Sequence, residues 1–257
     1  MGEVTRIGWT DGTFNGWWGC TKVGPGCDFC YAERDAKRYG YSWGQGALRR
    51  FFSEKHWNEP LRWNRKAKEA GKRMKVFCAS MADILDNEVE QKHRDRLWAL
   101  SQECDWIDWQ FLTKRIGNAK KMFPREWTRG EFPKNIWLGA TVVTQAEADR
   151  DVPKLLALNA AIRWLSIEPL IAPVKLKQAW LDLQGKNEFD ILPGIDWVIV
   201  GGESGVKPRP FELSWMEEII RACKSCCVAV FVKQDFGPKP GKQGRIPEEL
   251  WIQEFPK

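Results

Sequence analysis

The stretch IDWVIVGGES, residues 195–204, has the pattern of a fully buried strand that ends in glycines and a carboxylate. Longer amphipathic or irregular segments separate it from other short runs rich in β-branched or aromatic residues. Those runs lie at 13–19, 74–80, 106–113, 135–143, 162–170 and 227–234. Alternation of this kind is typical of parallel strands joined by crossovers. The sequence therefore predicts an α/β fold with mostly parallel strands, a complete or partial (β/α) TIM-like barrel.

Three helix starts are predicted from capping residues. Asp86 is expected to cap a helix in NEVEQKHRDRLWALSQE (87–103), while Thr144 with Glu147 and Ser214 with Glu217 fit the capping-box spacing. The Gly/Pro-rich segment at 236–247 is too close to the C-terminus to separate two domains. We therefore expect one domain over residues 1–257, with a short C-terminal extension.

Composition limits the classes of function. The net charge is +6, no apolar run approaches the roughly 20 residues of a membrane helix, and the first residues lack the apolar segment of a signal peptide. We therefore expect a cytoplasmic protein with no membrane partner, in which clustered cysteines are metal ligands or reactive thiols. With only two histidines, the chain has little material for histidine-based catalysis.

Polar residues follow most of the predicted strands. In a (β/α) barrel, function gathers at the carboxyl ends of the strands. The candidates at these ends are Ser80, Asp83, Thr141, Glu168 and Glu203. The two glutamates follow apolar runs, and a buried carboxylate is costly unless it has a partner or a ligand.

Three cysteines follow the first predicted strand within eleven positions. Cys20, Cys27 and Cys30 form the spacing C-x6-C-x2-C. Structural zinc sites normally close with four protein ligands, whereas three thiolates suit an iron–sulfur cluster with one open iron position. Zinc held by these thiolates and one remote ligand remains an alternative.

The remaining cysteines have simpler interpretations. Cys78 and Cys104 lie in or beside apolar runs and are expected in the core. The group CKSCC, with Cys223, Cys226 and Cys227, is either an auxiliary cluster site or helix and strand packing.

The cysteine segment, with Phe29 before the last cysteine in CDFC, resembles the radical S-adenosylmethionine (SAM) superfamily, although its first gap of six residues is longer than the commonest three. Four segments together are similar to a phage-associated family of three-cysteine proteins that is distantly similar to spore photoproduct lyase, and this similarity runs from about residue 7 to residue 234. The segments are IGWTDGTFNGWWGCTKVGPGCDFCYAE, GATVVTQAEADRDVP, WLSIEPL and IDWVIVGGESG.

The resemblance implies a partial barrel of the radical SAM type and a set of roles. Cys20, Cys27 and Cys30 would hold a [4Fe–4S] cluster whose open iron binds S-adenosyl-L-methionine. Ser80 and Asp83 fall where the superfamily meets the SAM amino group, and the candidates for ribose, carboxylate or adenine contacts are Thr141, Glu168 and Glu203. The implied chemistry is reductive cleavage of SAM to a 5′-deoxyadenosyl radical, with an electron donor such as flavodoxin or ferredoxin.

The expected substrate is a nucleotide. Basic segments with aromatic residues at 47–57, 62–75 and 113–127 are typical of nucleic-acid contact, with Arg49 and Arg50 as expected DNA contacts, although solvated helix faces explain each segment alone. By analogy with the family, the leading hypothesis is isomerisation or rearrangement of a modified thymidine in phage DNA. The alternatives are a radical SAM DNA-repair lyase, an RNA-modifying enzyme, or a zinc-stabilised nucleic-acid-binding module.

Overall fold

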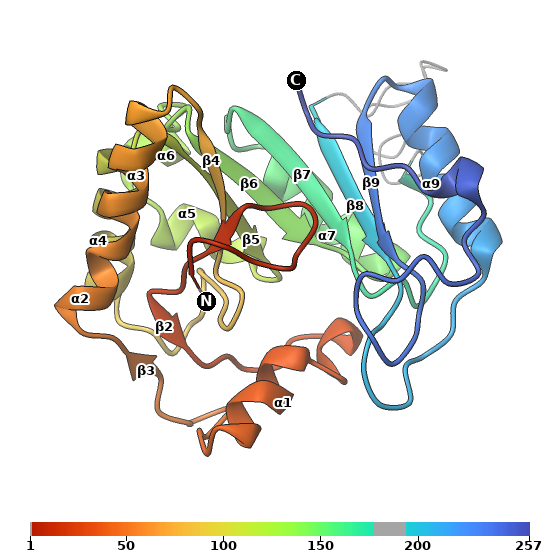
Figure 1. Cartoon of the computed structure of the whole chain (residues 1–257), viewed down its shortest axis with the longest axis horizontal. Coiled ribbons are helices and arrows are strands. Elements are labelled where there is room, and N and C mark those ends of the chain that lie inside the picture. The colour runs from red at the N-terminus through yellow and green to blue at the C-terminus, as the bar shows by residue number, and fades with distance from the viewer. Residues whose placement is uncertain (1, 177–193) are drawn as a thin grey trace. The chain divides into compact units, whose positions relative to one another are not determined.

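The computed structural model describes residues 2–176 and 194–257 (Figure 1). The chain folds as two compact units, the first formed by Met1–Leu138 with Leu158–Ala161 and the second by Gly139–Ala157 with Ile162–Lys257. The main sheet has seven strands in the order β1-β4-β5-β6-β7-β8-β9, which is also their order along the chain. This is the connectivity of a partial (β/α) barrel, so the predicted fold class is confirmed. The single domain stays a prediction.

The predicted strands after the first are all present, with shorter ends. Parallel pairing joins β1 to β4, β4 to β5, β7 to β8 and β8 to β9. The strands are β1 (Gly12–Thr13), β4 (Met74–Cys78), β5 (Ile107–Thr113), β6 (Ile136–Thr141), β7 (Ile162–Ile167), β8 (Trp197–Gly201) and β9 (Ala229–Gln234).

The first predicted strand, 13–19, is wrong in its extent. Only its beginning joins the main sheet as β1, and its later part forms β2 (Trp17–Trp18), which pairs antiparallel with β3 (Arg50–Phe51). The change occurs at Asn15, whose side chain accepts a hydrogen bond from Met81 N at 2.6 Å and donates one to Ser80 Oγ at 2.9 Å. These side-chain bonds take the place of further backbone pairing beside β4.

The helices cover the sheet through short apolar faces. In the first unit α3 buries Trp63 and Ala67, and Figure 1 shows α3 and α4 alongside β4 and β5. In the second unit α9 lies beside β8 and β9. The helices of the described residues are α1 (Tyr31–Arg38), α2 (Glu54–Trp57), α3 (Glu59–Glu69), α4 (Gln91–Glu103), α5 (Ala119–Met122), α6 (Arg125–Thr128), α7 (Gln145–Leu156) and α9 (Leu213–Ser225).

Tryptophan is mainly a core residue in this protein. At least nine of the sixteen tryptophans are buried, so most of them pack inside the protein. In the second unit Trp164 and Trp197 pack with ring centroids 5.6 Å apart. A Cβ at Gly139 would lie 2.4 Å from Trp164, so only glycine leaves room for this ring.

Two of the three predicted helix caps are wrong. Helix α4 begins at Gln91 after Glu90, and the Asp86 carboxylate instead pairs with Arg49 and accepts a hydrogen bond from Glu88 N in the turn before the helix. Helix α9 begins at Leu213, which places Ser214 inside the helix. The third cap is confirmed, since Thr144 Oγ1 accepts a hydrogen bond from Glu147 N at 3.2 Å.

We expect Thr144→Ala to lower the free energy of unfolding by about 1 kcal/mol, because the variant leaves the Glu147 amide without its side-chain acceptor. Urea denaturation measures this change. Ser214→Ala is the matched control, and its effect should stay within about 0.5 kcal/mol because this serine makes no cap. Equal losses in both variants would contradict the cap assignment.

Candidate functional site

The cysteine loop joins β2 to α1 in the first unit. Cys27 is buried at the end of a short 3-10 turn, Cys20 and Cys30 are half-buried, and all three thiols are free. The loop starts at Gly19, which has a φ of +113° and donates its amide to Met81 O. A Cβ at Gly19 would lie 2.7 Å from Arg49 Cδ, so both backbone conformation and space require glycine there.

The donor set of this loop fits an iron–sulfur cluster. Three free thiols in one short loop are the ligands that such clusters use. In the arrangement described for residues 2–176 and 194–257, no three His, Cys, Asp or Glu side chains converge to hold a metal ion. The fit therefore rests on the chemistry and the shared loop of the thiols.

Cys20 lies in a buried charged network. Arg115, which follows β5, donates from Nη1 to Cys20 Sγ at 3.4 Å and from Nη2 to Thr21 O at 2.5 Å. Burial raises the pKa of the Cys20 thiol to about 12, the charge of Asp83 acts in the same direction, and Arg115 opposes both. A coordinated metal would reverse this preference, because a metal-bound thiol is deprotonated.

Asp83 organises the strand ends around this network. Its carboxylate accepts hydrogen bonds from Thr113 Oγ1 at 2.7 Å and Lys114 N at 2.9 Å, and it pairs with Arg115 at 3.2 Å. These contacts connect the segment after β4 to the end of β5. Asp83 therefore has protein partners for both carboxylate oxygens, and its role as a SAM contact stays a prediction.

Ser80 lies between the cysteine loop and the end of β4. Its hydroxyl accepts from Asn15 Nδ2 at 2.9 Å, and its carbonyl accepts from Tyr31 Oη at 2.6 Å. Because Tyr31 directly follows Cys30, the predicted site residues Ser80 and Cys30 are brought together.

The other three predicted site residues lie in the second unit, at or after the ends of β6, β7 and β8. Thr141 Oγ1 is buried and has no hydrogen-bond partner among the described residues. Glu168 lies 2.9 Å from Lys233 Nζ, and Glu203 pairs with Arg209 at 2.6 Å. Both carboxylates thus have protein partners, as burial requires. The three roles in SAM binding stay predictions.

The other cysteines are largely structural. Cys78 and Cys104 are fully buried, as predicted. Cys223 is fully buried within α9, Cys226 ends that helix, and Cys227 is exposed with a φ of +55°. The choice between packing and an auxiliary cluster at this group stays a prediction.

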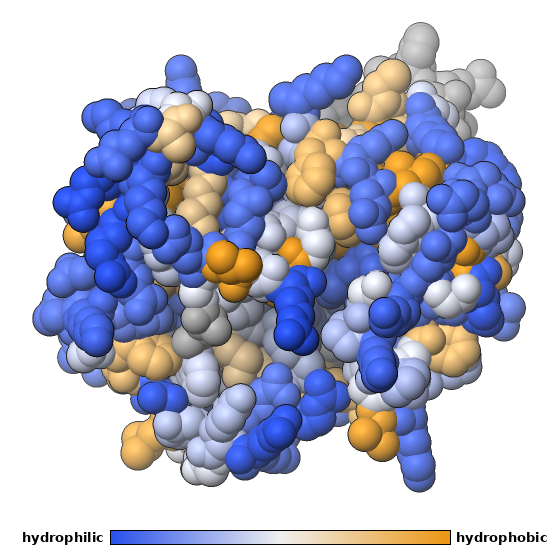
Figure 2. Space-filling view, in the orientation of Figure 1, coloured by the Kyte–Doolittle hydropathy of each residue, from blue (hydrophilic) through white to orange (hydrophobic). Residues whose placement is uncertain are grey.

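The basic segments predicted to contact nucleic acid contain both buried and solvent-exposed cations. Arg49 is wrong as an expected phosphate contact, because its side chain is only 2% exposed and pairs with Asp86 at 2.7 Å. By contrast, α3 in segment 62–75 carries a solvated charged face with Arg62, Arg65 and Lys68 exposed, and Figure 2 shows hydrophilic side chains over this helix.

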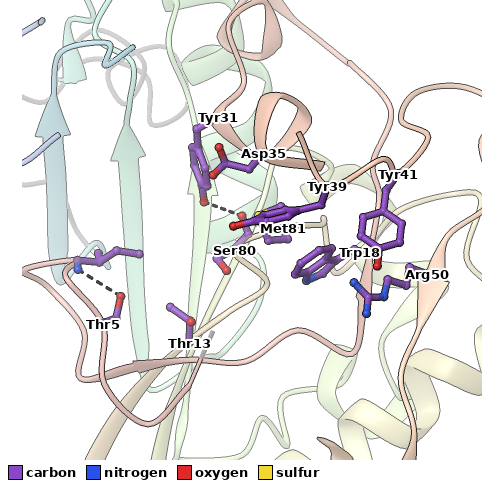
Figure 3. A pocket seen from close by; sticks show the side chains of 11 residues that line it. Thr5, Thr13, Trp18, Tyr31, Asp35, Tyr39, Tyr41, Arg50, Ser80 and Met81 are labelled. Carbon is purple, nitrogen blue, oxygen red and sulfur yellow. Dashed lines mark hydrogen bonds between the residues drawn. The ribbon is translucent and has the colours of Figure 1, made fainter. Parts of the chain in front are cut away.

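A cavity of about 470 Å³ lies beside the cysteine loop within the first unit (Figure 3). Its wall contains all three tyrosines of the chain, together with Trp18 and Arg50. The complete lining is Thr5, Ile7, Thr13, Trp18, Tyr31, Asp35, Tyr39, Tyr41, Arg50, Ser80 and Met81. Sequence reasoning missed this cavity, although the confinement of every tyrosine to residues 31–41 was a usable signal.

No helix within residues 2–176 and 194–257 is long and apolar enough to cross a membrane.

Comparisons with known proteins give a family and a distant fold likeness. The chain is similar to a spore photoproduct lyase double mutant with bound AdoMet and dinucleoside spore photoproduct, at 10% identity, a TM-score of 0.48, and coverage of 82% of this chain and 60% of that one. For spore photoproduct lyase complexed with dinucleoside spore photoproduct, the identity is 9%, the TM-score 0.46, and the coverage 80% and 58%. The chain thus spans about three fifths of the length of those structures.

No curated protein matches it. One family model matches residues 4–248, and the chain belongs to that family, described as "Protein of unknown function (DUF5131)".

Proposed function

We propose that this protein is a radical SAM enzyme. The observation that carries the proposal is the set of three free thiols, Cys20, Cys27 and Cys30, on one loop that starts at Gly19 and leads into α1. These cysteines would hold a [4Fe–4S] cluster. When bound with SAM, the cluster would supply the electron that cleaves SAM to a 5′-deoxyadenosyl radical for hydrogen abstraction.

The chain's own residues would position and shield this chemistry. Arg115 donates to Cys20 Sγ and to the carbonyl of Thr21, which fixes the first cysteine against the end of β5. Tyr31, which directly follows the last cysteine, donates a hydrogen bond to the Ser80 carbonyl. Such fixed contacts support orientation of the reactants, which is the main task of the protein in cofactor-based radical chemistry.

The proposed substrate is a nucleotide in DNA, with isomerisation or rearrangement of a modified thymidine as the reaction. The similarity of the four sequence segments to the phage-associated three-cysteine family supports this choice. A radical SAM DNA-repair lyase and an RNA-modifying enzyme use the same site chemistry. A cytoplasmic flavodoxin or ferredoxin would supply the electron.

The test is anaerobic reconstitution with iron and sulfide, followed by dithionite and SAM, with 5′-deoxyadenosine measured by chromatography. We expect a coloured iron–sulfur protein that forms 5′-deoxyadenosine only when SAM and reductant are both present. A colourless protein that retains zinc and cleaves no SAM would contradict the proposal and identify the zinc-stabilised module instead.

A further inference from the structure

The cavity beside the cysteine loop contains a cation, Arg50, that has no acidic partner in the part of the chain that the structure describes. Arg50 is half-buried, and its guanidinium carbon lies 4.4 Å from the ring centroid of Tyr41, 4.9 Å from that of Trp18 and 5.0 Å from that of Phe52. Within the described residues it forms no ion pair. The neighbouring Arg49 instead pairs with Asp86 and Glu88. Arg50 is therefore a cation held in place by aromatic rings, with its charge free for a ligand.

The cavity also offers an exposed aromatic ring beside two rings that pack in the fold. Tyr39 is 64% exposed, and its ring centroid lies 6.4 Å from that of Trp18. Tyr41 meets Trp18 edge to face at 5.7 Å, and Figure 3 shows Tyr41, Trp18 and Arg50 together in one part of the wall. A volume of about 470 Å³ falls within the range of about 300–1,000 Å³ that is usual for ligand pockets.

The cavity is adjacent to the proposed cofactor loop. Tyr31 lines it and directly follows Cys30, while Ser80 lines it after the end of β4. The hydrogen bond from Tyr31 Oη to Ser80 O, drawn in Figure 3, holds this side of the wall together. A molecule in the cavity would therefore lie next to the loop that carries the thiols.

We propose that this cavity binds one nucleotide of a single-stranded DNA segment, with the base against Trp18, Tyr39 and Tyr41 and a phosphate at Arg50. An apolar ligand would leave the charge of Arg50 unused, and a small anion would leave the exposed ring surface unused. A nucleotide uses both, since bases stack on aromatic side chains and phosphates pair with arginine. The inference rests on the proposed function and identifies where its substrate would be held.

The test measures binding of a fluorescein-labelled oligothymidylate to the anaerobically reconstituted protein by fluorescence anisotropy. We expect Arg50→Gln and Tyr39→Ala each to weaken binding by about tenfold, as the loss of one stacking or phosphate contact does. Arg50→Gln should also reduce the slope of log affinity against log salt by about one.

Matched controls come from the same unit. Arg62→Gln removes an exposed arginine of α3, and Phe51→Ala removes an exposed ring of β3, and neither residue lines the cavity. Both controls should bind the oligonucleotide within about twofold of the unchanged protein. Thermal melting of all four variants identifies any loss of affinity that is caused by unfolding.

The outcomes separate this inference from the proposed function. Unchanged oligonucleotide binding in Arg50→Gln and Tyr39→Ala would overturn the inference even if the protein cleaves SAM. A loss of affinity for SAM in place of DNA would also overturn it, because the cavity would then hold the adenosine of SAM. Selective loss of DNA binding would support the inference even if no SAM cleavage were found.

Discussion

Replacing Cys27 with alanine is expected to abolish formation of 5′-deoxyadenosine and to lower the iron retained after reconstitution to the background level. Cys27 is the buried member of the three cysteines and lies at the end of the 3-10 turn that closes the loop. With only two thiolates left, the loop lacks a ligand that a cluster with one open iron requires. Cys20→Ala and Cys30→Ala should behave in the same way.

The control for this prediction is Cys226→Ala. Cys226 lies at the end of α9, in the second unit, and is half-buried. This variant should retain both iron and SAM cleavage, which would also argue against an auxiliary cluster at CKSCC. Undiminished SAM cleavage in Cys27→Ala would contradict the cluster assignment. The prediction requires the iron content and the product yield to fall together. The melting temperature of each variant identifies any loss that is caused by unfolding.

The sheet was predictable because burial leaves a strong signal in the sequence. The runs around β4 to β9 are rich in β-branched, aromatic and other apolar residues and end in glycine or polar residues, and the structure keeps each of them with trimmed ends. The extent predicted for the first strand was wrong because of a single side-chain contact. The Asn15 side chain accepts a hydrogen bond from the Met81 amide, which lies 66 positions away, and no local sequence pattern predicts such a contact.

The charged partners in the site were not predictable, because they are set by tertiary contacts. Asp86 has the position of a helix cap in the sequence, yet its carboxylate meets Arg49, which lies 37 positions earlier. Arg115 reaches Cys20 over 95 positions. Sequence reasoning could place the cysteines on one loop and the candidates at strand ends, but the choice of ion pairs depends on which loops the fold brings together.

Arg49→Met is expected to lower the free energy of unfolding by about 3–5 kcal/mol, the usual cost of removing one member of a buried ion pair. The Arg49 side chain is 2% exposed and that of Asp86 only 1%, so the variant leaves a buried carboxylate without its close cation and with only Arg115, at 4.0 Å, to balance its charge. It also removes the hydrogen bond from Arg49 Nη2 to Thr21 Oγ1 and the bonds to the Gly44 and Ala47 carbonyls, which hold the segment beside the cysteine loop.

Urea denaturation measures this loss against two further variants. Lys66→Ala breaks an exposed pair with Glu3 and should cost less than about 1 kcal/mol. Arg49→Met combined with Asp86→Asn removes the carboxylate charge that has lost its close partner and should be more stable than Arg49→Met alone, because the burial of that charge is the main penalty. If Arg49 were instead a phosphate contact, Arg49→Met would weaken DNA binding and leave stability unchanged. The buried pair predicts the opposite result. Arg49→Met should lower the free energy of unfolding, and its DNA binding should decline only in proportion to the folded fraction.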